Sequence, residues 1–110
     1  MSAQAQTSSG PVVTAMSGGV LRALDKLTGQ VQDLTLAAGT RMAFGRIEVG
    51  LMECRVPRDN PAGDAFALIT VTEVDRPLPV FEGWIIASSP ALNAMDHARY
   101  DVWVLRCNTA

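Results

Sequence analysis

The sequence has few aromatic residues (5 %), a single histidine, and only 18 % charged residues. Its nine lysines and arginines are scattered and are outnumbered by eleven aspartates and glutamates, which gives a net charge of −2. Nucleic-acid binding needs clustered basic residues, and an anionic membrane surface attracts runs of them. We therefore expect neither nucleic acid nor an anionic lipid surface as a partner.

Apolar residues make up 48 % of the 110 residues, but no apolar run approaches the roughly 20 residues that a membrane-spanning helix requires. A chain of this length and composition has room for one soluble domain with one core. Residues 1–18 are rich in Ser, Ala, Gln and Gly and lack periodicity. We therefore expect a flexible N-terminal tail over residues 1–18 and a single β domain over residues 19–108.

The start of the chain bears on the compartment. The letters SAQAQ after Met1 resemble the small-residue zone around a signal-peptide cleavage site, although the basic and apolar regions of an intact signal peptide are not in the sequence. This favours an exported protein whose signal peptide has been removed. An ordinary cytosolic amino terminus is the alternative.

Strand-prone stretches alternate with turn residues along the whole chain. The clearest unit is a hairpin in which Val20–Leu24 and Gln30–Leu36 flank Asp25–Gly29, an Asp-led turn that ends in a glycine. About seven short strands punctuated in this way predict an all-β fold. We expect a small antiparallel sandwich or a partly open barrel.

Strict alternation assigns the side chains of two strands to faces. In the strand that starts at residue 47, one face carries Ile47, Val49 and Leu51 and the other carries Met52, Cys54 and Val56. In the last strand, Trp103 and Leu105 share a face with Cys107, and Val102 and Val104 lie opposite. Apolar residues on both faces indicate that the strand from residue 47 is central in a two-layer structure.

The two cysteines, Cys54 and Cys107, are too far apart for a CxxC redox motif, and with one histidine they are too few for a closed zinc site. We therefore expect no metal and no cofactor. In an oxidising compartment, a bridge between them would close a loop of about 50 residues and contribute roughly 4 kcal/mol. The letters SAQAQ, which favour export to an oxidising compartment, also favour this disulfide. Two buried free thiols in a cytosolic protein are the alternative.

The stretch SSPALNAMDHARY, residues 88–100, predicts one short helix near the C-terminus. Ser89 is placed to cap this helix, and Pro90 occupies its first position, where a backbone N–H is not needed. We expect about two turns of helix that pack Leu92 and Met95 onto the sheet.

The same stretch contains the residue types of a hydrolase. Ser88 or Ser89 would be the nucleophile, His97 the base, and Asp96 or Asp101 the residue that orients it. However, no GxSxG elbow is present, and a capping serine already directs its oxygen at backbone N–H groups. The sequence therefore favours a protein that is not an enzyme.

The large aromatic side chains permit two interpretations. Trp84, Tyr100 and Trp103 would supply the core with area that a chain poor in aromatics otherwise lacks. Alternatively, together with Phe81 they would line a groove for a small ligand between the sheet and the short helix. The scarcity of other large side chains favours the core.

Three segments carry a family resemblance: VLRALDKLTGQV, the FG…IEV…MEC segment, and FEGWIIASSPALNAMDHARYDVWVLRC. Through them the chain, from Gly19 to Cys107, resembles domain-of-unknown-function family 2155 of alphaproteobacteria. The resemblance implies export and a cleaved signal peptide, and so supports the periplasm and the disulfide. It transfers no catalytic role to Ser89, His97 or Asp101. It also implies genes that lie near one for an accessory subunit of respiratory NADH dehydrogenase.

We therefore expect a non-catalytic interaction or accessory module of the cell envelope. Its partner would be an unidentified envelope protein or, as the gene neighbourhood suggests, respiratory NADH dehydrogenase, served as an accessory or assembly protein on the periplasmic side. The candidate partner surface consists of Asn93, Asp96, His97 and Arg99, pointing to solvent beside an uncovered sheet edge. A small-ligand-binding β domain is the alternative function, and a Ser/His hydrolase is a remote one.

Overall fold

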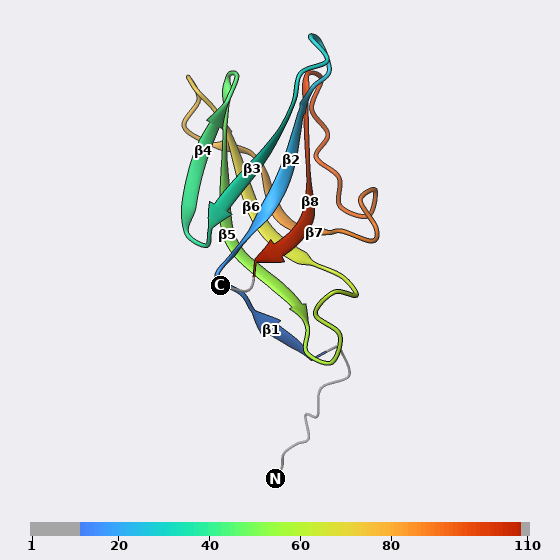
Figure 1. The fold of residues 1–110 in the computed structure, drawn as a ribbon. Coiled ribbons are helices and arrows are strands. Elements are labelled where there is room, and N and C mark those ends of the chain that lie inside the picture. Colours follow the sequence, from blue (N-terminus) through green and yellow to red (C-terminus); the bar gives the residue numbers. More distant parts are fainter. Residues whose placement is uncertain (1–11, 109–110) are drawn as a thin grey trace.

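The computed structural model describes residues 12–108, which form eight strands and, within that range, no helix (Figure 1). The strands are β1 (Val13–Ala15), β2 (Gly18–Asp25), β3 (Val31–Ala37), β4 (Thr40–Phe44), β5 (Ile47–Pro57), β6 (Phe66–Glu73), β7 (Pro79–Ile86) and β8 (Tyr100–Asn108). The all-β class is confirmed. The prediction of a short helix near the C-terminus is wrong.

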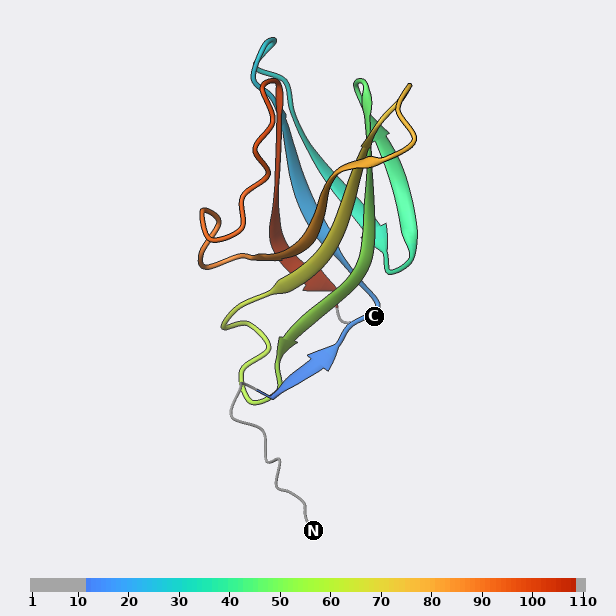
Figure 2. The same ribbon diagram turned by 180° about the vertical axis from the view of Figure 1, so that it is seen from behind.

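The strands make two antiparallel sheets. The five-stranded sheet has the order β1-β5-β6-β7, and β4 also pairs with β5. β1 pairs with residues 55–57 of β5 and β4 with residues 47–51, so these two short strands divide one edge of β5 between them. The three-stranded sheet has the order β3-β2-β8. The two sheets face each other as layers of a sandwich and do not close into a barrel (Figure 2).

The β2–β3 hairpin forms at the predicted place. The Asp25 carboxylate accepts hydrogen bonds from the backbone N–H groups of Leu27 (2.9 Å) and Thr28 (3.3 Å), and Gly29 has a φ of +79°. An Asp side chain stabilises a turn in this way, and glycine adopts positive φ without steric cost. The turn therefore follows from the local sequence.

β5 is central, as predicted, but its side chains do not alternate strictly. The register between β5 and β6 skips Met52, which marks a β-bulge. A bulge adds one residue to a strand and thereby shifts the alternation that follows. As a result Leu51, Cys54 and Val56 are all buried in the core, whereas Met52 is exposed. The prediction that Cys54 and Val56 lie opposite Leu51 is wrong for this reason.

β8 contains a bulge of the same kind. The register between β2 and β8 skips Leu105, so the inward positions are Val104 and then Cys107. Trp103 therefore does not share a face with Cys107, contrary to the prediction. Each cysteine follows the bulged residue of its strand by two positions. The two bulges together direct both sulfur atoms into the space between the sheets.

Cys54 of β5 and Cys107 of β8 form the predicted disulfide, which joins the two sheets with the Cα atoms 5.7 Å apart. Gly19 of β2 lies opposite Cys107 in the register. A Cβ atom at Gly19 would lie 2.8 Å from the Cys54 sulfur and 2.9 Å from the Arg106 carbonyl oxygen, so only glycine leaves room beside the bridge.

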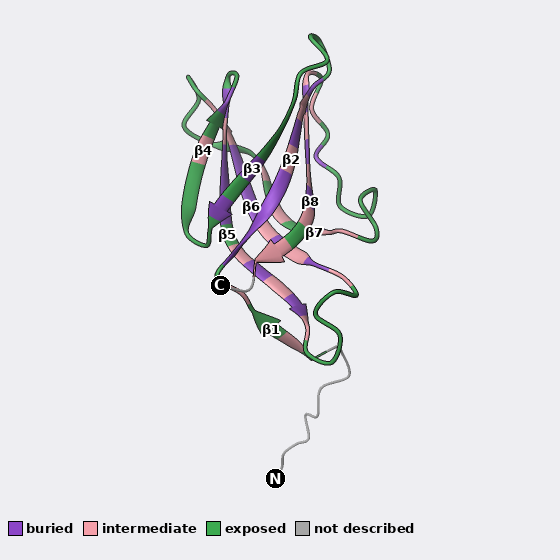
Figure 3. Ribbon diagram, viewed as in Figure 1, coloured by how far each residue is buried: buried purple, intermediate pink, exposed green. Residues whose placement is uncertain are grey.

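The core lies between the sheets and is mainly aliphatic (Figure 3). Its largest fully buried side chains are Leu21, Leu34, Ile47, Leu51, Ile69, Val49 and Val71. Tyr100 is buried among them, but Trp84 is 36 % exposed and Trp103 is only half-buried. The interpretation of all three aromatics as core residues therefore holds for Tyr100 and is wrong for the two tryptophans.

The stretch expected to form the N-terminal tail is partly ordered in strands. Residues 13–15 form β1 and pair with β5, and β2 begins at Gly18. Residues 1–11 lie outside the described residues, so for them the tail stays a prediction. The β domain thus begins with β1, a few residues before the predicted boundary.

Candidate functional site

Residues 87–99, which we call the strap, connect β7 to β8. The strap begins beside the lower half of β8 and must reach its upper end (Figure 1). Contacts from the strap to β7, β6 and β2 fix this path in place of a helix. The strap instead begins with two consecutive reverse turns: the Ser89 N–H donates to the Ile86 carbonyl at 3.1 Å, and the Leu92 N–H donates to the Ser89 carbonyl at 3.0 Å.

The second of these turns, Ser89–Leu92, explains why Ser89 and Pro90 occur together here. Ser89 supplies the backbone acceptor of the turn, and Pro90 lies inside it, where a fixed φ suits a turn as well as a helix start. The predicted helix cap is therefore replaced by a turn at the same residues. Leu92 is 65 % exposed instead of packing on the sheet, whereas Met95 is 6 % exposed and belongs to the core, as predicted.

His97 ties the strap to the end of the sandwich. Its Nε2 lies 3.0 Å from Oε2 of Glu73, the last residue of β6. Its Nδ1 accepts hydrogen bonds from the backbone N–H groups of Arg99 (3.0 Å) and Tyr100 (3.1 Å). Because Nδ1 accepts, the proton of the neutral ring lies on Nε2 and is donated to the Glu73 carboxylate. The Lys26 ammonium donates to the His97 carbonyl at 2.7 Å.

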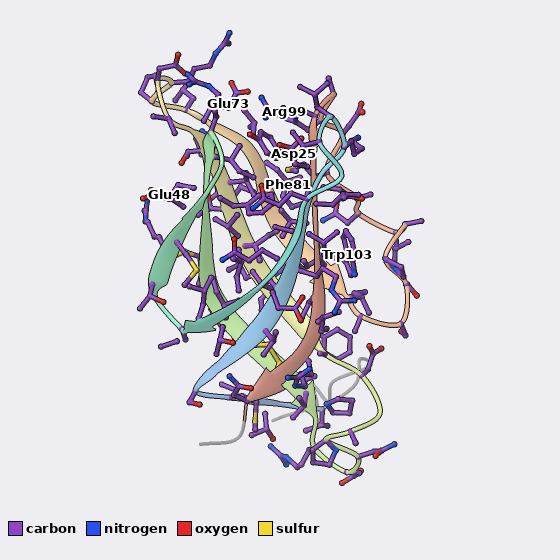
Figure 4. All side chains as sticks on the ribbon, turned by 45° about the horizontal axis from the view of Figure 1, so that its top comes forward. Asp25, Glu48, Glu73, Phe81, Arg99 and Trp103 are labelled. Atoms are coloured by element: carbon purple, nitrogen blue, oxygen red, sulfur yellow. A yellow bond between two sulfur atoms is a disulfide. The ribbon has the colours of Figure 1, made fainter. Side chains whose placement is uncertain are left out.

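Arg99 pairs with the buried carboxylate of Asp25 (Figure 4). The guanidinium Nη2 lies 2.8 Å from Oδ2 of Asp25, and Nε lies 3.1 Å from Oδ1. The hydrogen bonds from Arg99, together with the N–H groups of Leu27 and Thr28, lower the pKa of the Asp25 carboxyl to about 2 against the opposing effect of burial. The same pair raises the pKa of Arg99. The hairpin turn and the strap are thus fixed to each other by charge.

Most residues of the candidate partner surface bond to other parts of the domain. The Asn93 amide donates to the Trp84 carbonyl at 2.7 Å, His97 bonds Glu73, and Arg99 bonds Asp25. Three of the four residues expected to point freely to solvent therefore hold the strap in place, although Asn93 is exposed, as Asp96 is. The sequence could not show this, because the partners come from β2, β6 and β7.

The residues of the hydrolase alternative do not meet. The Ser88 hydroxyl donates to Oδ2 of Asp64 at 2.7 Å, and Oδ1 of Asp64 accepts from the backbone N–H groups of Ser88 and Ala65. These bonds lower the pKa of Asp64 despite its desolvation, which is the largest single effect and acts in the opposite direction. His97 instead bonds Glu73, and the Asp101 carboxylate accepts from the N–H of Val102. Ser88 thus joins the 58–64 loop to the strap.

The four aromatic residues of the predicted groove do not form one. Phe81 packs against the core, and the Tyr100 hydroxyl accepts a hydrogen bond from the backbone N–H of Arg46 at 2.9 Å. Trp103 lies on the outside of β8, away from Phe81 (Figure 4). Trp84 points outward from β7, on the opposite sheet. No ligand groove is therefore built from this set.

Trp84 instead lies in an apolar outer face of the five-stranded sheet. We call this surface the Trp84 face, and it consists of Val13, Arg55, Phe66, Leu68, Trp84 and Ile86. All except Leu68 line a hollow of about 200 Å³, and Leu68 lies opposite Trp84 in the register. The Arg55 guanidinium carbon lies 5.2 Å from the centre of the Trp84 ring, a cation–π contact.

The sequence of β6 contains a signal for the Trp84 face. In β6, Ala67, Ile69 and Val71 face the core, so Phe66 and Leu68 at the intervening positions must point outward. A solvated sheet face would carry polar residues at such positions. Two large apolar residues on the second face of a strand therefore indicate an exposed apolar surface.

Comparison with known proteins gives the family. Residues 19–107 match the model of a family described as an uncharacterized protein conserved in bacteria, DUF2155. The chain belongs to this family. The chain is also 31 % identical over 94 residues to the uncharacterized protein RP359 of Rickettsia prowazekii, strain Madrid E. No solved structure matches the chain.

The match to the Rickettsia protein covers 83 % of this DUF2155 chain and 61 % of the relative. The chain thus spans about three fifths of the length of the curated relative that it matches. The family match confirms the resemblance seen in the sequence and covers both cysteines, the strap and Trp84.

Two further properties of this DUF2155 domain concern the described residues alone. Within residues 12–108 no group of three or more His, Cys, Asp or Glu side chains is placed to hold a metal ion. No helix in the same range is long and apolar enough to cross a membrane.

Proposed function

We propose that this protein is a non-catalytic interaction module of the bacterial cell envelope, that it works in the periplasm, and that it binds a partner protein through the Trp84 face. One observation carries the proposal. The outer side of the five-stranded sheet, where a solvated sheet presents polar residues, presents Phe66, Leu68, Trp84 and Ile86 together.

The composition of the Trp84 face supports a protein partner. Tryptophan and arginine are the side chains that dominate the binding energy of protein interfaces. Here Arg55 lies over Trp84 and is held there by a hydrogen bond from its Nε to Oε1 of Glu53 at 2.9 Å. The sheet fixes both side chains before any partner arrives, and such preorganisation lowers the entropy cost of binding.

The exposed part of Trp84 sets the size of the expected effect. A tryptophan side chain offers up to about 250 Å² of surface, and Trp84 exposes 36 % of its surface. A partner that covers roughly 90 Å² gains about 2 kcal/mol at about 25 cal/mol per Å². Loss of the ring therefore weakens binding by about thirtyfold.

The disulfide supports the periplasmic location. Disulfides form and persist in oxidising compartments, and the bridge between Cys54 and Cys107 joins the two sheets of this small domain.

Affinity capture from the envelope of the bacterium that encodes the protein tests the proposal. Trp84→Ala should abolish or strongly reduce recovery of a stoichiometric partner, because the aromatic anchor is lost. Trp103→Ala is the matched control, since Trp103 also points outward but from β8 of the other sheet. Equal recovery with Trp84→Ala and wild type, at equal melting temperature, would refute the proposed face.

The family suggests a more specific form of the proposal. The gene neighbourhood that the resemblance implies makes the periplasmic side of respiratory NADH dehydrogenase the first partner to look for, with this protein as an accessory or assembly factor. Mass spectrometry of the captured material decides it. Subunits of that complex should be recovered with wild type and lost with Trp84→Ala, and a different partner would remove this form of the proposal.

A small-ligand-binding domain is the second candidate. One observation favours it: a cleft of about 570 Å³ lies beside the disulfide, between the 61–65 segment and residues 105–107 of β8. Ligand pockets commonly have volumes of roughly 300 to 1,000 Å³. Native mass spectrometry of protein purified gently from its own envelope should then show a bound small molecule. A partner protein that depends on Trp84 favours the first candidate instead.

A further inference from the structure

The cleft of about 570 Å³ borders the disulfide, and Cys107 is one of the residues that line it. One wall of the cleft is the segment from Pro61 to Ala65 together with Ala87 and Ser88, and the other wall is residues 105–107 of β8. The first wall carries alanine or glycine at positions 62, 63, 65 and 87. These small side chains leave room for another molecule beside β8.

Hydrogen bonds hold the wall opposite β8 in place. The Ala87 N–H donates to the Ala65 carbonyl at 2.9 Å, which continues the pairing of β6 with β7 by one step. The Ser88 hydroxyl and N–H donate to the Asp64 carboxylate at 2.7 Å and 3.0 Å. The cleft is therefore a fixed feature of the fold, and a molecule that enters it finds it already formed.

The two sulfur atoms of the bridge differ in access. Cys54 is 0 % exposed and belongs to the aliphatic core. Cys107 is half-buried, packs against the edge of that core and lines the cleft. A thiolate attacks one sulfur of a disulfide, and its rate depends on access to that sulfur. A thiolate that enters the cleft therefore meets Cys107, and Cys54 is the sulfur that leaves.

We propose that the cleft is the docking site of a protein dithiol–disulfide oxidoreductase and that Cys107 is the cysteine that exchanges with it. When the bridge is made, the Cys107 thiolate attacks the disulfide of the oxidoreductase. A disulfide forms between Cys107 and the oxidoreductase, and the second sulfur of the oxidoreductase leaves as a thiolate.

The Cys54 thiolate then attacks the Cys107 sulfur, which forms the native bridge and releases the first sulfur of the oxidoreductase as a thiolate. Both cysteines of this chain are thereby oxidised, and the disulfide of the oxidoreductase is reduced to a dithiol. The two protons pass from the cysteines of this chain to the thiolates of the oxidoreductase. Reduction of the bridge follows the same steps in reverse.

Burial assigns the second step to Cys54. A mixed disulfide at Cys107 needs space for the attached chain, and the cleft provides this space beside β8. A mixed disulfide at Cys54 would place the attached chain inside the core, where close packing leaves no room for it. Cys54 therefore resolves the mixed disulfide, because it has only to reach the neighbouring sulfur of Cys107.

The cleft fits a segment of a protein better than a small thiol. Its volume lies within the range of about 300 to 1,000 Å³ in which proteins bind whole ligands, and one thiol group needs far less. Asp64 and Arg106 give its lining one charge of each sign, so charge does not select a small anionic or cationic thiol. A dithiol protein also keeps its second thiol beside the mixed disulfide at a high effective concentration, which a monothiol lacks.

Reduction kinetics of the oxidised wild-type chain test this site. The probes are reduced thioredoxin, as a protein dithiol, and dithiothreitol, as a small one, and alkylation with mass spectrometry follows the loss of the bridge. The rate should rise in proportion to the concentration of either probe and should not change in urea too dilute to unfold the domain, because the native protein reacts. Ala62→Trp should slow reduction by thioredoxin at least about fivefold, since a large ring in the cleft obstructs the approach to Cys107.

Ala43→Trp is the matched control, because Ala43 is also an exposed alanine but lies on β4, outside the cleft. Its bridge should be reduced at the wild-type rate. Trp84→Ala should also leave the rate unchanged, because no residue of the Trp84 face takes part in the exchange. This site and the proposed function therefore fail separately. Equal melting temperatures confirm that the variants fold.

Two single-cysteine variants identify the sulfur that exchanges. The Cys107 thiol of Cys54→Ser should react with N-ethylmaleimide at least about tenfold faster than the Cys54 thiol of Cys107→Ser, because only the former lines the cleft. In concentrated urea the two thiols should react at the same rate. If thermal scans show that these variants do not fold without the bridge, the kinetics of Ala62→Trp against Ala43→Trp decide.

Three results would overturn the proposal. The first is a reduction rate that does not depend on the concentration of the probes, because the bridge would then exchange only after unfolding. The second is equal reduction of Ala62→Trp and Ala43→Trp by thioredoxin. The third is a Cys54 thiol that reacts as fast as the Cys107 thiol in folded protein. If dithiothreitol reduces the native bridge and thioredoxin does not, the cleft admits small thiols alone and is no docking site for a protein.

Discussion

Met95→Ala should destabilise the domain strongly, whereas Leu92→Ala should not. Met95 is 6 % exposed and fills the core beneath the strap, while Leu92, three residues earlier, is 65 % exposed on its turn. Burying a large aliphatic side chain contributes about 1.5–3 kcal/mol, and Met→Ala changes in cores cost about 2–5 kcal/mol. Because an irregular strap can settle partly into the space left behind, we expect about 2–3 kcal/mol for Met95→Ala.

Thermal and urea unfolding, both under oxidising conditions, measure the difference. For a domain of this size about 2–3 kcal/mol corresponds to a fall in melting temperature of roughly 10–20 °C. Leu92→Ala should stay within about 0.5 kcal/mol of wild type. Asn93→Ala should cost about 1 kcal/mol, because its amide bond to the Trp84 carbonyl is lost. Equal losses of unfolding free energy for Leu92→Ala and Met95→Ala would contradict the irregular path of the strap, because a helix packed on the sheet would bury both side chains.

Three further predictions concern the ends of the strap and the disulfide. Cys54→Ala with Cys107→Ala should lower the free energy of unfolding by about 4 kcal/mol, since the bridge spans a sequence separation of 53. Intact oxidised protein should weigh about two daltons less than reduced protein. Freely alkylated thiols in the native protein would contradict the bridge. Gly19→Ala should destabilise the protein in both redox states, because its Cβ would lie 2.9 Å from the Arg106 carbonyl oxygen, and should destabilise the oxidised protein more, because the bridged Cys54 sulfur at 2.8 Å cannot turn aside. Equal effects in both states would refute the contribution of the bridge. Folding lowers the pKa of the Asp25 carboxyl from 3.8 to about 2, so the stability that it provides is present above about pH 4 and is lost as the pH falls toward 2. The urea midpoint of Asp25→Asn should therefore fall less steeply over this range than that of wild type. Identical slopes would contradict the pairing with Arg99.

The parts of the fold that the sequence predicts are those with local causes. The hairpin at Asp25–Gly29 is specified by a turn carboxylate and a glycine that lie within the turn itself. The central place of β5 follows from its length and its apolar content. The pairing of Cys54 with Cys107 follows from their number and from the expectation of an oxidising compartment, without any knowledge of geometry.

The parts that the sequence does not predict depend on partners distant in the chain. The bulges at Met52 and Leu105 are properties of strand pairing, and they reverse the faces of all later residues in β5 and β8. The strap looks helical because Pro90, Leu92 and Met95 suit a helix locally. Its actual path is set by contacts to β2, β6 and β7, which no local pattern contains.

The same division applies to the candidate sites. The sequence places His97 and Arg99 on the candidate partner surface, and only the folded structure shows that Glu73 and Asp25 make them anchors of the strap. The Trp84 face forms because the pairing of β6 with β7 places Leu68 opposite Trp84 and Phe66 opposite Ile86, which no single strand shows.

Photo-crosslinking inside the bacterium tests the central claim, that the Trp84 face binds a protein partner, most directly. A photoreactive amino acid at position 86 places the probe at the edge of the hollow beside Trp84, and the same probe at position 103 lies on the outer side of the other sheet. We predict one discrete crosslinked protein with the probe at position 86 and none with the probe at position 103. The crosslink should disappear when Trp84→Ala is added. No crosslink at position 86, or the same crosslink from both positions, would contradict the account.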